Sequence, residues 1–565
     1  MRKDRIVVLV TTMLLLATGL FAGGSKEAAP AASTAPTSTA VGPTNSNPLS
    51  DLRVRQAMAY AIDMKTACAT LLQGMALPAD SDIPNGPWKT PDLSKYEYNP
   101  EKAKALLKEA KWDSNRVLDL IYYYADQETV DLMTAIQQWF AAVGIKMKFR
   151  QITGDLAAQL NALPADAEKG PSGITWDLAY GAKAALALQE YYNAYARSVD
   201  GKPQIAHTPA NATMDSLIAA TNSTSDIAKQ KEAFFALEKY MASNVKDIPL
   251  YYQQLFIYEN KRLNRNGGLY GNDQYNYDWG ILNWTVTADA NGKQILYTNT
   301  GPKQFFFEPW SDPAIHITRK VLWDRLITCD GSLTPTTGKL ASSYKLSADG
   351  MNLTFTLRDG LKWHDGSPLT VDDVKWSVET ALKFPTLNAV FKKTFNSLKG
   401  AKDYLEGKTP GVAGITASGN TITFDFASLD PNCLLTFTQW APLPKKYLAK
   451  ADPLKFQQDP FWQNPVGSGP YRIDKVSMND YLVMVPYKDY WGGVAKIDQI
   501  VCYPSDDNDA NVVKNAAAQK LDYGFTKNVG DVKSLQAMSH MNVKAVDIPY
   551  TRILWVNQFP KPAAK

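Results

Sequence analysis

Apolar and polar side chains alternate most clearly over residues 353–357, where Leu, Phe and Leu occupy every second position. This period of two is typical of a half-buried strand. Asp-Gly pairs at 359–360 and 365–366 predict tight turns, because glycine tolerates the positive φ that such turns require. Between the turns, residues 361–363 predict a second short strand, in which we expect Trp363 to pack in the core.

Three polar residues mark the expected beginnings of helices. Thr370, with Asp373 three residues later, predicts an N-cap and a capping box. Asp51 precedes a helical apolar stripe within residues 50–63. Asn99 is followed by Pro100, and proline suits the first helical position because its missing N–H loses no hydrogen bond there.

Strands and helices alternate through the first half of the chain. The pattern predicts a strand over 117–124, a helix to about residue 143, and a strand over 145–149. A helix over about 225–242 and a strand over 248–259 follow. Strand–helix–strand order is typical of α/β layering.

The second half of the chain adds further strands without any internal repeat. We expect strands over 293–297, 421–426, 472–476 and 551–558, and a hairpin-like turn at 490–493.

The N-terminus has the pattern of an export signal. Basic residues within 2–5 precede an apolar run over 6–21 and small residues over 22–24, so we expect a signal peptide over 1–24. Residues 25–49 are rich in Ala, Pro, Ser and Thr and predict a disordered tether. The first cysteine is Cys68, far from the expected cleavage site, so we expect no lipid anchor there and a periplasmic or extracellular protein.

The length of the chain limits the number of domains that we expect, and its net charge limits the classes of function. A chain of 565 residues exceeds one compact core and suggests two or three domains. Its net charge of +4 is too small to indicate nucleic-acid binding. The four cysteines of an exported chain allow three complete disulfide pairings, and their spacing favours none of them.

Catalytic and cofactor motifs are missing from the sequence. The four histidines, at 207, 316, 364 and 540, lack metal-ligand spacing, and there is no nucleophile elbow or P-loop. Gly467-Ser468-Gly469 leads into a strand rather than a helix, which disfavours a phosphate site. We therefore expect no cofactor, no metal and no enzymatic activity. A secreted carbohydrate-active hydrolase is the alternative, because paired carboxylates cannot be recognised by counting acids.

Several segments together resemble the bacterial extracellular solute-binding proteins of family 5, the oligopeptide-binding type. The later block resembles the beginning of that family, in the cassette 341–374, VGSGPY at 466–471, YKDYWGG at 487–493 and TRILWVNQ at 551–558. The earlier block resembles the family's end, in segments 51–63, 99–112 and 247–263. Because the landmarks occur in exchanged order without duplication, the resemblance implies a circular permutation.

The resemblance implies an α/β, two-lobed periplasmic-binding-protein fold (type II, cluster C-like) with a hinge, circularly permuted. We expect a smaller lobe over 50–185, a larger lobe over 186–558 and a tail over 559–565. The hinge strands are expected near 174–182 and 551–558. Such a monomeric receptor would deliver a solute to the permease subunits of an ABC importer.

Aromatic residues beside polar ones are the candidate ligand contacts, since flat rings and amides line many solute sites. A structural role in the core is the alternative for each tryptophan. Peptide binders of the family usually carry an aspartate shortly after the segment matching 176–178, and here Glu190 is the only acid. That difference favours an oligosaccharide over a peptide. The candidates are Glu190, Asp273, Tyr275, Trp279, Glu308, Trp310, Gln439, Trp440, Trp555 and Asn557.

Overall fold

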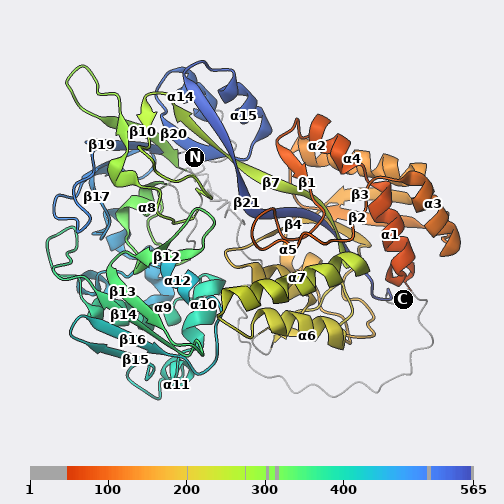
Figure 1. Cartoon of the computed structure of the whole chain (residues 1–565), viewed down its shortest axis with the longest axis horizontal. Helices are drawn as coiled ribbons and strands as arrows, with labels where there is room; N and C mark the ends of the chain where they lie inside the picture. The colour runs from red at the N-terminus through yellow and green to blue at the C-terminus, as the bar shows by residue number, and fades with distance from the viewer. Residues whose placement is uncertain are drawn as a thin grey trace, which may run out of the picture.

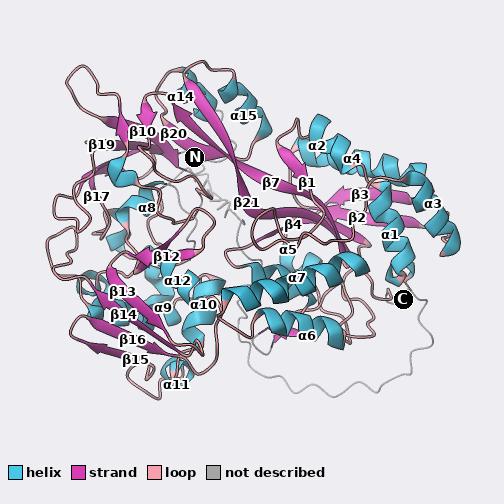
Figure 2. Cartoon of the chain, viewed as in Figure 1, coloured by secondary structure: helices cyan, strands magenta, loops and turns pink. Residues whose placement is uncertain are grey.

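The computed structural model describes residues 47–199, 202–273, 275–300, 305–311, 317–504 and 511–561. The expected signal peptide, most of the expected tether, His316 and the last four residues lie outside these ranges. The described chain forms two α/β bodies, each with its own large apolar core, as Figures 1 and 2 show. Among the described helices, none combines the length and the apolar character that a membrane span needs.

The smaller body is built on three parallel strands. β2 (Val117–Tyr122) pairs with β3 (Lys146–Gln151) on one side and β4 (Leu178–Ala184) on the other. The helices of this body are α1 (Leu52–Ala61), α2 (Met64–Thr70), α3 (Pro100–Glu109), α4 (Gln127–Ala142) and α5 (Leu156–Asn161). The predicted caps are confirmed: the side chains of Asp51 and Asn99 accept hydrogen bonds from the first turns of α1 and α3.

Helices α6 (Ala212–Thr221) and α7 (Ile227–Asn244) also belong to the smaller body. The Arg55 guanidinium of α1 donates to the carbonyl oxygens of Asn244 and Val245, at the end of α7. Val245 and Ile248 share the apolar core of α1 and β4. The expected lobe boundary at residue 185 is therefore wrong, because the packing of α7 joins residues 186–250 largely to the smaller body.

The cassette of residues 341–374 folds as an antiparallel sheet and a helix in the larger body. The sheet order is β13 (Ala341–Leu346), β14 (Asn352–Leu357), β16 (Thr421–Asp425) and β15 (Ile415–Ser418). Thr370 is the N-cap of α9 (Val371–Leu382) and its N–H donates to the Asp373 carboxylate, so the capping box is confirmed. The second short strand is wrong, because the two turns leave only the single bridge of Lys362 with Pro368.

The remaining strands of the larger body continue into one long sheet. Its order is β17 (Tyr471–Ser477), β18 (Tyr481–Pro486), β19 (Gln499–Pro504), β10 (Ile295–Thr300), β20 (Tyr523–Thr526), β7 (Asp247–Asn260), β21 (Met541–Val556), β4, β2 and β3. Further helices of this body are α8 (Ile317–Leu322), α10 (Ala389–Asn396), α11 (Ala401–Leu405), α12 (Cys433–Gln439), α13 (Lys445–Leu448), α14 (Asn511–Ala517) and α15 (Val529–Gln536).

Two long strands run from one body to the other. β7 (Asp247–Asn260) and β21 (Met541–Val556) pair antiparallel, and Figure 1 shows them crossing between the bodies. Their register shifts between Asp547 and Thr551 and again between Arg552 and Ile553. Pro549 lies in the first irregularity, where its missing N–H cannot join the ladder. The second crossing is thus β7 rather than the expected segment 174–182, since β4 lies within the smaller body.

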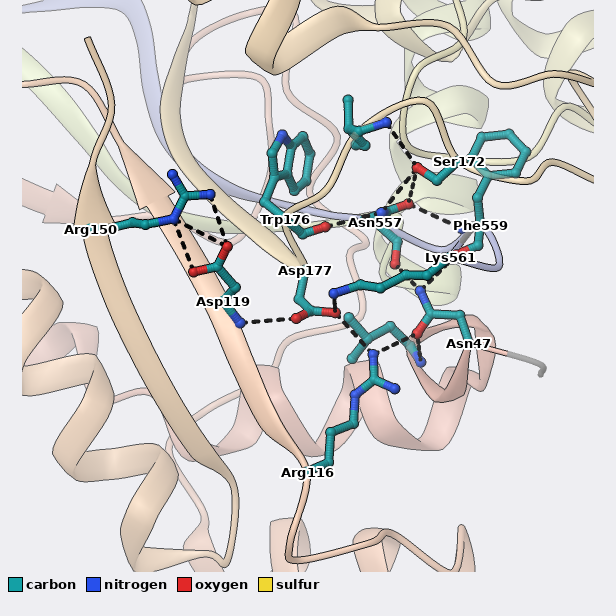
Figure 3. A network of polar contacts seen from close by, with 12 residues as sticks. Asn47, Arg116, Asp119, Arg150, Ser172, Trp176, Asp177, Asn557, Phe559 and Lys561 are labelled. Carbon is teal, nitrogen blue, oxygen red and sulfur yellow. Dashed lines mark hydrogen bonds and ion pairs between the residues drawn. The ribbon is translucent and has the colours of Figure 1, made fainter. Parts of the chain in front are cut away.

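The two ends of the described chain meet on the smaller body (Figure 3). Asn47 Nδ2 donates to the carbonyl oxygens of Asn557 and Phe559, at 2.7 and 2.9 Å. The buried Asp177 carboxylate forms ion pairs with Arg116 at 2.9 Å and with Lys561 at 2.8 Å. Residues from both ends therefore share one polar network with the start of β4.

Candidate functional site

Three of the predicted ligand contacts lie together in the core of the larger body. The Trp310 and Trp440 rings stack with centroids 6.2 Å apart, and both side chains are fully buried. Trp310 Nε1 donates to the Ala441 carbonyl oxygen at 2.8 Å. The Glu308 carboxylate accepts from the Trp310 and Ser311 amides and from the Gln457 side chain. Glu308 and Trp310 thus bind protein groups, whereas Trp440 Nε1 is buried without a hydrogen-bond partner among the described residues.

The segment 272–279 is held in place by protein partners. Gln439 accepts from the Asn276 amide at 2.9 Å and donates to its carbonyl oxygen at 2.6 Å, so it fixes this segment to α12. The Asp273 carboxylate accepts from the Tyr277 and Tyr523 hydroxyls, and Arg265 lies 3.4 Å from it. The neighbouring predicted residues Tyr275 and Trp279 are also buried.

Trp555 lies at the end of β21 and Asn557 directly follows this strand, in the smaller body. Gly181 on β4 makes room for the Trp555 ring, because a Cβ at Gly181 would lie 2.2 Å from it. The Asn557 amide donates to the Trp176 carbonyl oxygen at 3.0 Å and to Ser172 Oγ at 3.2 Å. Both residues therefore contribute to the structure around the chain ends.

Glu190 lies where the two bodies touch. Just before it, Leu186 and Ala187 pack in the core of the larger body, whereas Tyr191 packs in a cluster of the smaller body with α6 and α7. Nearby, Lys393 Nζ of α10 donates to Asn222 Oδ1, after α6, at 2.8 Å. We call this region, with the β7–β21 crossing, the inter-lobe junction.

The inter-lobe junction contains polar atoms without protein partners. The Tyr191 hydroxyl is buried and has no hydrogen-bond partner among the described residues. Arg552 Nη1 also lacks one in the part of the chain that the structure describes, although Arg552 Nε donates to Gln253 Oε1 at 3.1 Å. The Arg552 guanidinium lies 3.9 Å from the centre of the Tyr124 ring. A buried polar atom without a partner is costly, so these two atoms are candidate contacts for a bound solute.

Charges of both signs shape the electrostatics of the junction. Burial raises the pKa of Glu190 to about 7, while Lys393 opposes this shift. Burial also acts to raise the pKa of Tyr550, but the nearby Arg552 and Lys527 outweigh it and the pKa of Tyr550 is lowered. The junction thus has an acidic group on the segment after β4 and basic groups near the hinge of β21.

Sequence reasoning missed Tyr191, Tyr550 and Arg552 as candidates. Tyr191 lies directly beside the predicted Glu190, and Arg552 is part of the recognised segment 551–558. A signal was available in Pro549, because a proline within a long strand predicts an interrupted ladder and hence a bend. The meeting of these segments depends on the tertiary fold.

The four cysteines, all within the described part of the chain, form no disulfide bond. Cys68, Cys329, Cys433 and Cys502 are all buried free thiols, so none of the three possible disulfide pairings occurs. Within the described ranges, no three His, Cys, Asp or Glu residues cluster in a way that could hold a metal ion.

Comparison with known proteins places the chain among solute receptors. The sequence profile of the bacterial extracellular solute-binding proteins, family 5 (middle), matches residues 23–190 and 336–565. A putative ABC transporter peptide-binding protein of Brucella ovis is 27% identical over 180 residues, which cover 32% of this chain and 31% of that protein. The dipeptide-binding protein of Escherichia coli is 23% identical over 287 residues, which cover 48% of this chain and 52% of that protein.

Two further relatives differ in the ligand that their names give. The nickel-binding protein NikA of Staphylococcus aureus is 27% identical over 227 residues, covering 40% of each chain. The solved structure of Haemophilus influenzae OppA with a peptide is 23% identical, with a TM-score of 0.34, and covers 42% of this chain and 46% of that one. The chain therefore spans between about a third and a half of the length of these curated relatives from Brucella, Staphylococcus and Escherichia.

Proposed function

Because the chain belongs to the bacterial extracellular solute-binding proteins of family 5, we propose that it is the substrate-binding component of an ABC importer. In this role it captures a short peptide at the inter-lobe junction and presents it to the permease subunits. The observation that carries the proposal is the pair of partnerless polar atoms, on Tyr191 and Arg552, at the junction of two bodies that β7 and β21 connect. The protein acts as a monomer outside the cytoplasm.

Hinge motion would open and close the junction. The register of β7 and β21 is interrupted at residues 548–550, so the ladder between the bodies lacks regular pairing at that point. Residues at strand ends and loops absorb the backbone rotation in such closures. The contact of Lys393 with Asn222 would separate on opening, because these residues belong to different bodies.

A peptide fits the charges of the junction better than the sugar favoured by the sequence. A free peptide carries an ammonium and a carboxylate that can pair with Glu190 and Arg552, whereas an oligosaccharide is neutral and offers no charge to either. Charge-assisted hydrogen bonds are about twice as strong as neutral ones, so complementary termini would give specificity. The Brucella and Escherichia relatives support this ligand class, since both are named as peptide-binding proteins and neither as a hydrolase.

A thermal-shift screen of the full chain tests the proposal. The ligands are trialanine, N-acetyl-trialanine, trialanine amide, cellotriose and a nickel–histidine complex. We expect trialanine, at about 100 times its Kd, to add about 2.7 kcal/mol to the free energy of unfolding. Either blocked peptide should bind at least tenfold more weakly. A shift with cellotriose or nickel–histidine and none with any peptide would contradict the peptide class, and release of sugar products would contradict the receptor role.

Arg552→Gln separates carboxylate recognition from general stability. We expect the variant to lose at least tenfold in affinity for trialanine and much less for trialanine amide, which lacks the carboxylate. The pKa of Tyr550 should rise in the same variant, as read from tyrosinate absorbance, because Arg552 lowers it. Arg472→Gln is the matched control, since Arg472 is exposed on β17 of the larger body. Equal losses for both peptides would argue against contact between Arg552 and the carboxylate.

We also propose that the chain is circularly permuted relative to other members of the family, which the order of the landmarks supports. Asn47 binds the backbone at Asn557 and Phe559, so the segments that an ordinary member would join are already adjacent. Between the earlier and the later block of landmarks, Gln294 Oε1 accepts from the Val286 amide at 3.0 Å, across the exposed turn 287–293. This turn would connect the original end of the chain to its original beginning.

A further inference from the structure

The smaller body contains a cavity of about 1060 Å³, whose lining includes none of Glu190, Tyr191 and Arg552 of the inter-lobe junction. It lies between α1 and α2 on one side and α7 on the other, and the loop of residues 94–98 borders it. Every lining residue belongs to 59–98 or 238–249, so the larger body contributes nothing to it. We call it the small-lobe cavity.

Two buried carboxylates in its lining share one ammonium group. Lys183 Nζ lies 2.7 Å from Asp82 Oδ2 and 2.6 Å from Asp247 Oδ2. All three side chains are at most 4% exposed, and the Tyr195 hydroxyl also donates to Asp247. Asp82 Oδ1 has no hydrogen-bond partner in the described part of the chain. When both carboxylates are ionised, the group has a surplus negative charge in a site of low dielectric, which is costly without a further cation.

The rest of the lining favours a cation with an apolar body. Six acidic side chains and two lysines line the cavity: Asp63, Asp80, Asp82, Glu97, Glu238 and Asp247 against Lys65 and Lys95. Apolar residues from α1, α2, α7 and β7 form much of the remaining wall, among them Ile62, Met64, Met241, Val245 and Ile248. An anion would meet repulsion from this lining, and a bare metal ion would leave the apolar wall without contact.

We propose that the small-lobe cavity binds an aliphatic primary amine, whose ammonium group donates to Asp82 Oδ1 while its hydrocarbon chain lies against the apolar wall. The position of this site, in one body only, makes its occupancy compatible with solute binding at the inter-lobe junction. Bound amine would supply the missing donor to the buried carboxylate and would compensate the surplus negative charge.

The ionisation of Asp82 should make the affinity of the cavity for an amine depend on pH. Burial and the neighbouring Asp247 raise the pKa of Asp82 to about 8, against the opposing effect of Lys183. In the empty cavity near pH 6, Asp82 therefore carries a proton that an incoming ammonium must displace. Affinity should increase as the pH is raised from 6 to 8. The other titratable groups facing Asp82 are Asp247 and Lys183 from the strands and Tyr191, Tyr192 and Tyr195 from η2 (Leu188–Tyr195).

Isothermal titration of the full chain with 1-hexylamine tests the site, with 1-hexanol as the uncharged control. At pH 8 we expect saturable binding of one hexylamine per chain and at least tenfold weaker binding of hexanol. The affinity at pH 6 should be at least tenfold lower than at pH 8. Equal binding of the two compounds, or no saturable binding of hexylamine at millimolar concentration, would overturn the proposal.

Two variants and one control variant test whether hexylamine binds in the small-lobe cavity. Asp82→Asn has the shape of the original side chain and should weaken hexylamine binding at least tenfold and remove its pH dependence. Asp63→Asn, at another acidic position of the lining, should retain both the affinity for hexylamine and the dependence of this affinity on pH. Ala242→Phe places a ring in the cavity and should abolish binding even if Asp82→Asn fails to fold. Trialanine binding at the junction should be unchanged in Ala242→Phe. Full hexylamine affinity in either Asp82→Asn or Ala242→Phe would exclude this site.

Discussion

Asn47 Nδ2 lies 2.7 Å from the carbonyl oxygen of Asn557, so a hydrogen bond joins residues that are 510 positions apart. Asn47 is also the N-cap of the short 3-10 helix before α1, because its Oδ1 accepts from the Leu49 amide at 3.1 Å. One side chain thus orders the first described turn and holds the end of β21 beside it. The buried Asp177, paired with Arg116 and Lys561, completes the attachment (Figure 3).

Asn47→Ala should destabilise the smaller body. The substitution removes a cap and two buried hydrogen bonds, which together are worth about 3 kcal/mol. Urea unfolding followed by circular dichroism measures the change in the free energy of unfolding. The exposed Asn115→Ala is the control and should change it by less than about 0.5 kcal/mol. A loss below about 1 kcal/mol in Asn47→Ala would show that the chain ends are held mainly by other contacts.

Lys183→Met should be among the most destabilising single substitutions in the chain. It removes the ammonium that both Asp82 and Asp247 share and leaves two buried carboxylates together. Breaking a buried ion pair in this way costs about 3–5 kcal/mol. The double variant Lys183→Met with Asp247→Asn should recover part of the loss, because one of the two charges is then absent. Urea unfolding checks both variants, and no recovery in the double variant would argue against charge repulsion as the cause.

Glu238 should make the smaller body lose stability as the pH rises. Burial raises the pKa of Glu238 from 4.5 to about 7, although the Ser81 hydroxyl and the Thr90 amide donate to its carboxylate. Between these pH values the folded state binds more protons than the unfolded chain, so the free energy of unfolding falls as the pH increases. The full effect is about 3 kcal/mol, complete near pH 7.

Glu238→Gln isolates this contribution, because glutamine does not titrate. The difference in free energy of unfolding between the variant and the original chain should change by about 3 kcal/mol between pH 4.5 and pH 7 and stay constant above pH 8. Other titrating groups cancel in this difference, including His207, whose pKa burial lowers to about 4. A difference that is constant over the whole range would show that Glu238 titrates normally in the folded protein.

Local patterns predicted most elements, while contacts between distant segments remained hidden. The caps at Asp51, Asn99 and Thr370 were predictable because they depend on residues within one helical turn. The lobe boundary could not be predicted in this way, because α7 is joined to the smaller body by the hydrogen bond of Arg55 to Val245, 190 positions away. Tryptophans such as Trp310 resembled ligand contacts, since sequence does not distinguish an aromatic ring in the core from one in a binding site.

A rearranged gene tests whether the order of segments matters to the fold. The chain would run from residue 293 to 561, through a flexible linker of about eight residues, and then from 47 to 287. Such a linker spans roughly 15 Å, and the bonds of Asn47 to Asn557 and Phe559 hold the ends to be joined close together. The new ends fall in the exposed turn around Asp289, whose carboxylate accepts from the nearby backbone amides of Asn291 and Lys293.

We expect the free energy of unfolding of this rearranged chain to lie within about 1 kcal/mol of the original value, because exposed turns tolerate new termini. Its affinity for the same peptide should lie within threefold of the original affinity. The control opens the chain between Leu255 and Phe256 of β7 with the same linker. Those residues pair with Val546 and Ala545 of β21, so the control should lose the connection between the bodies and fail to bind. If the first rearrangement also failed to fold, the present order of segments would be required for stability, and the permuted relationship to the family would lose its structural basis.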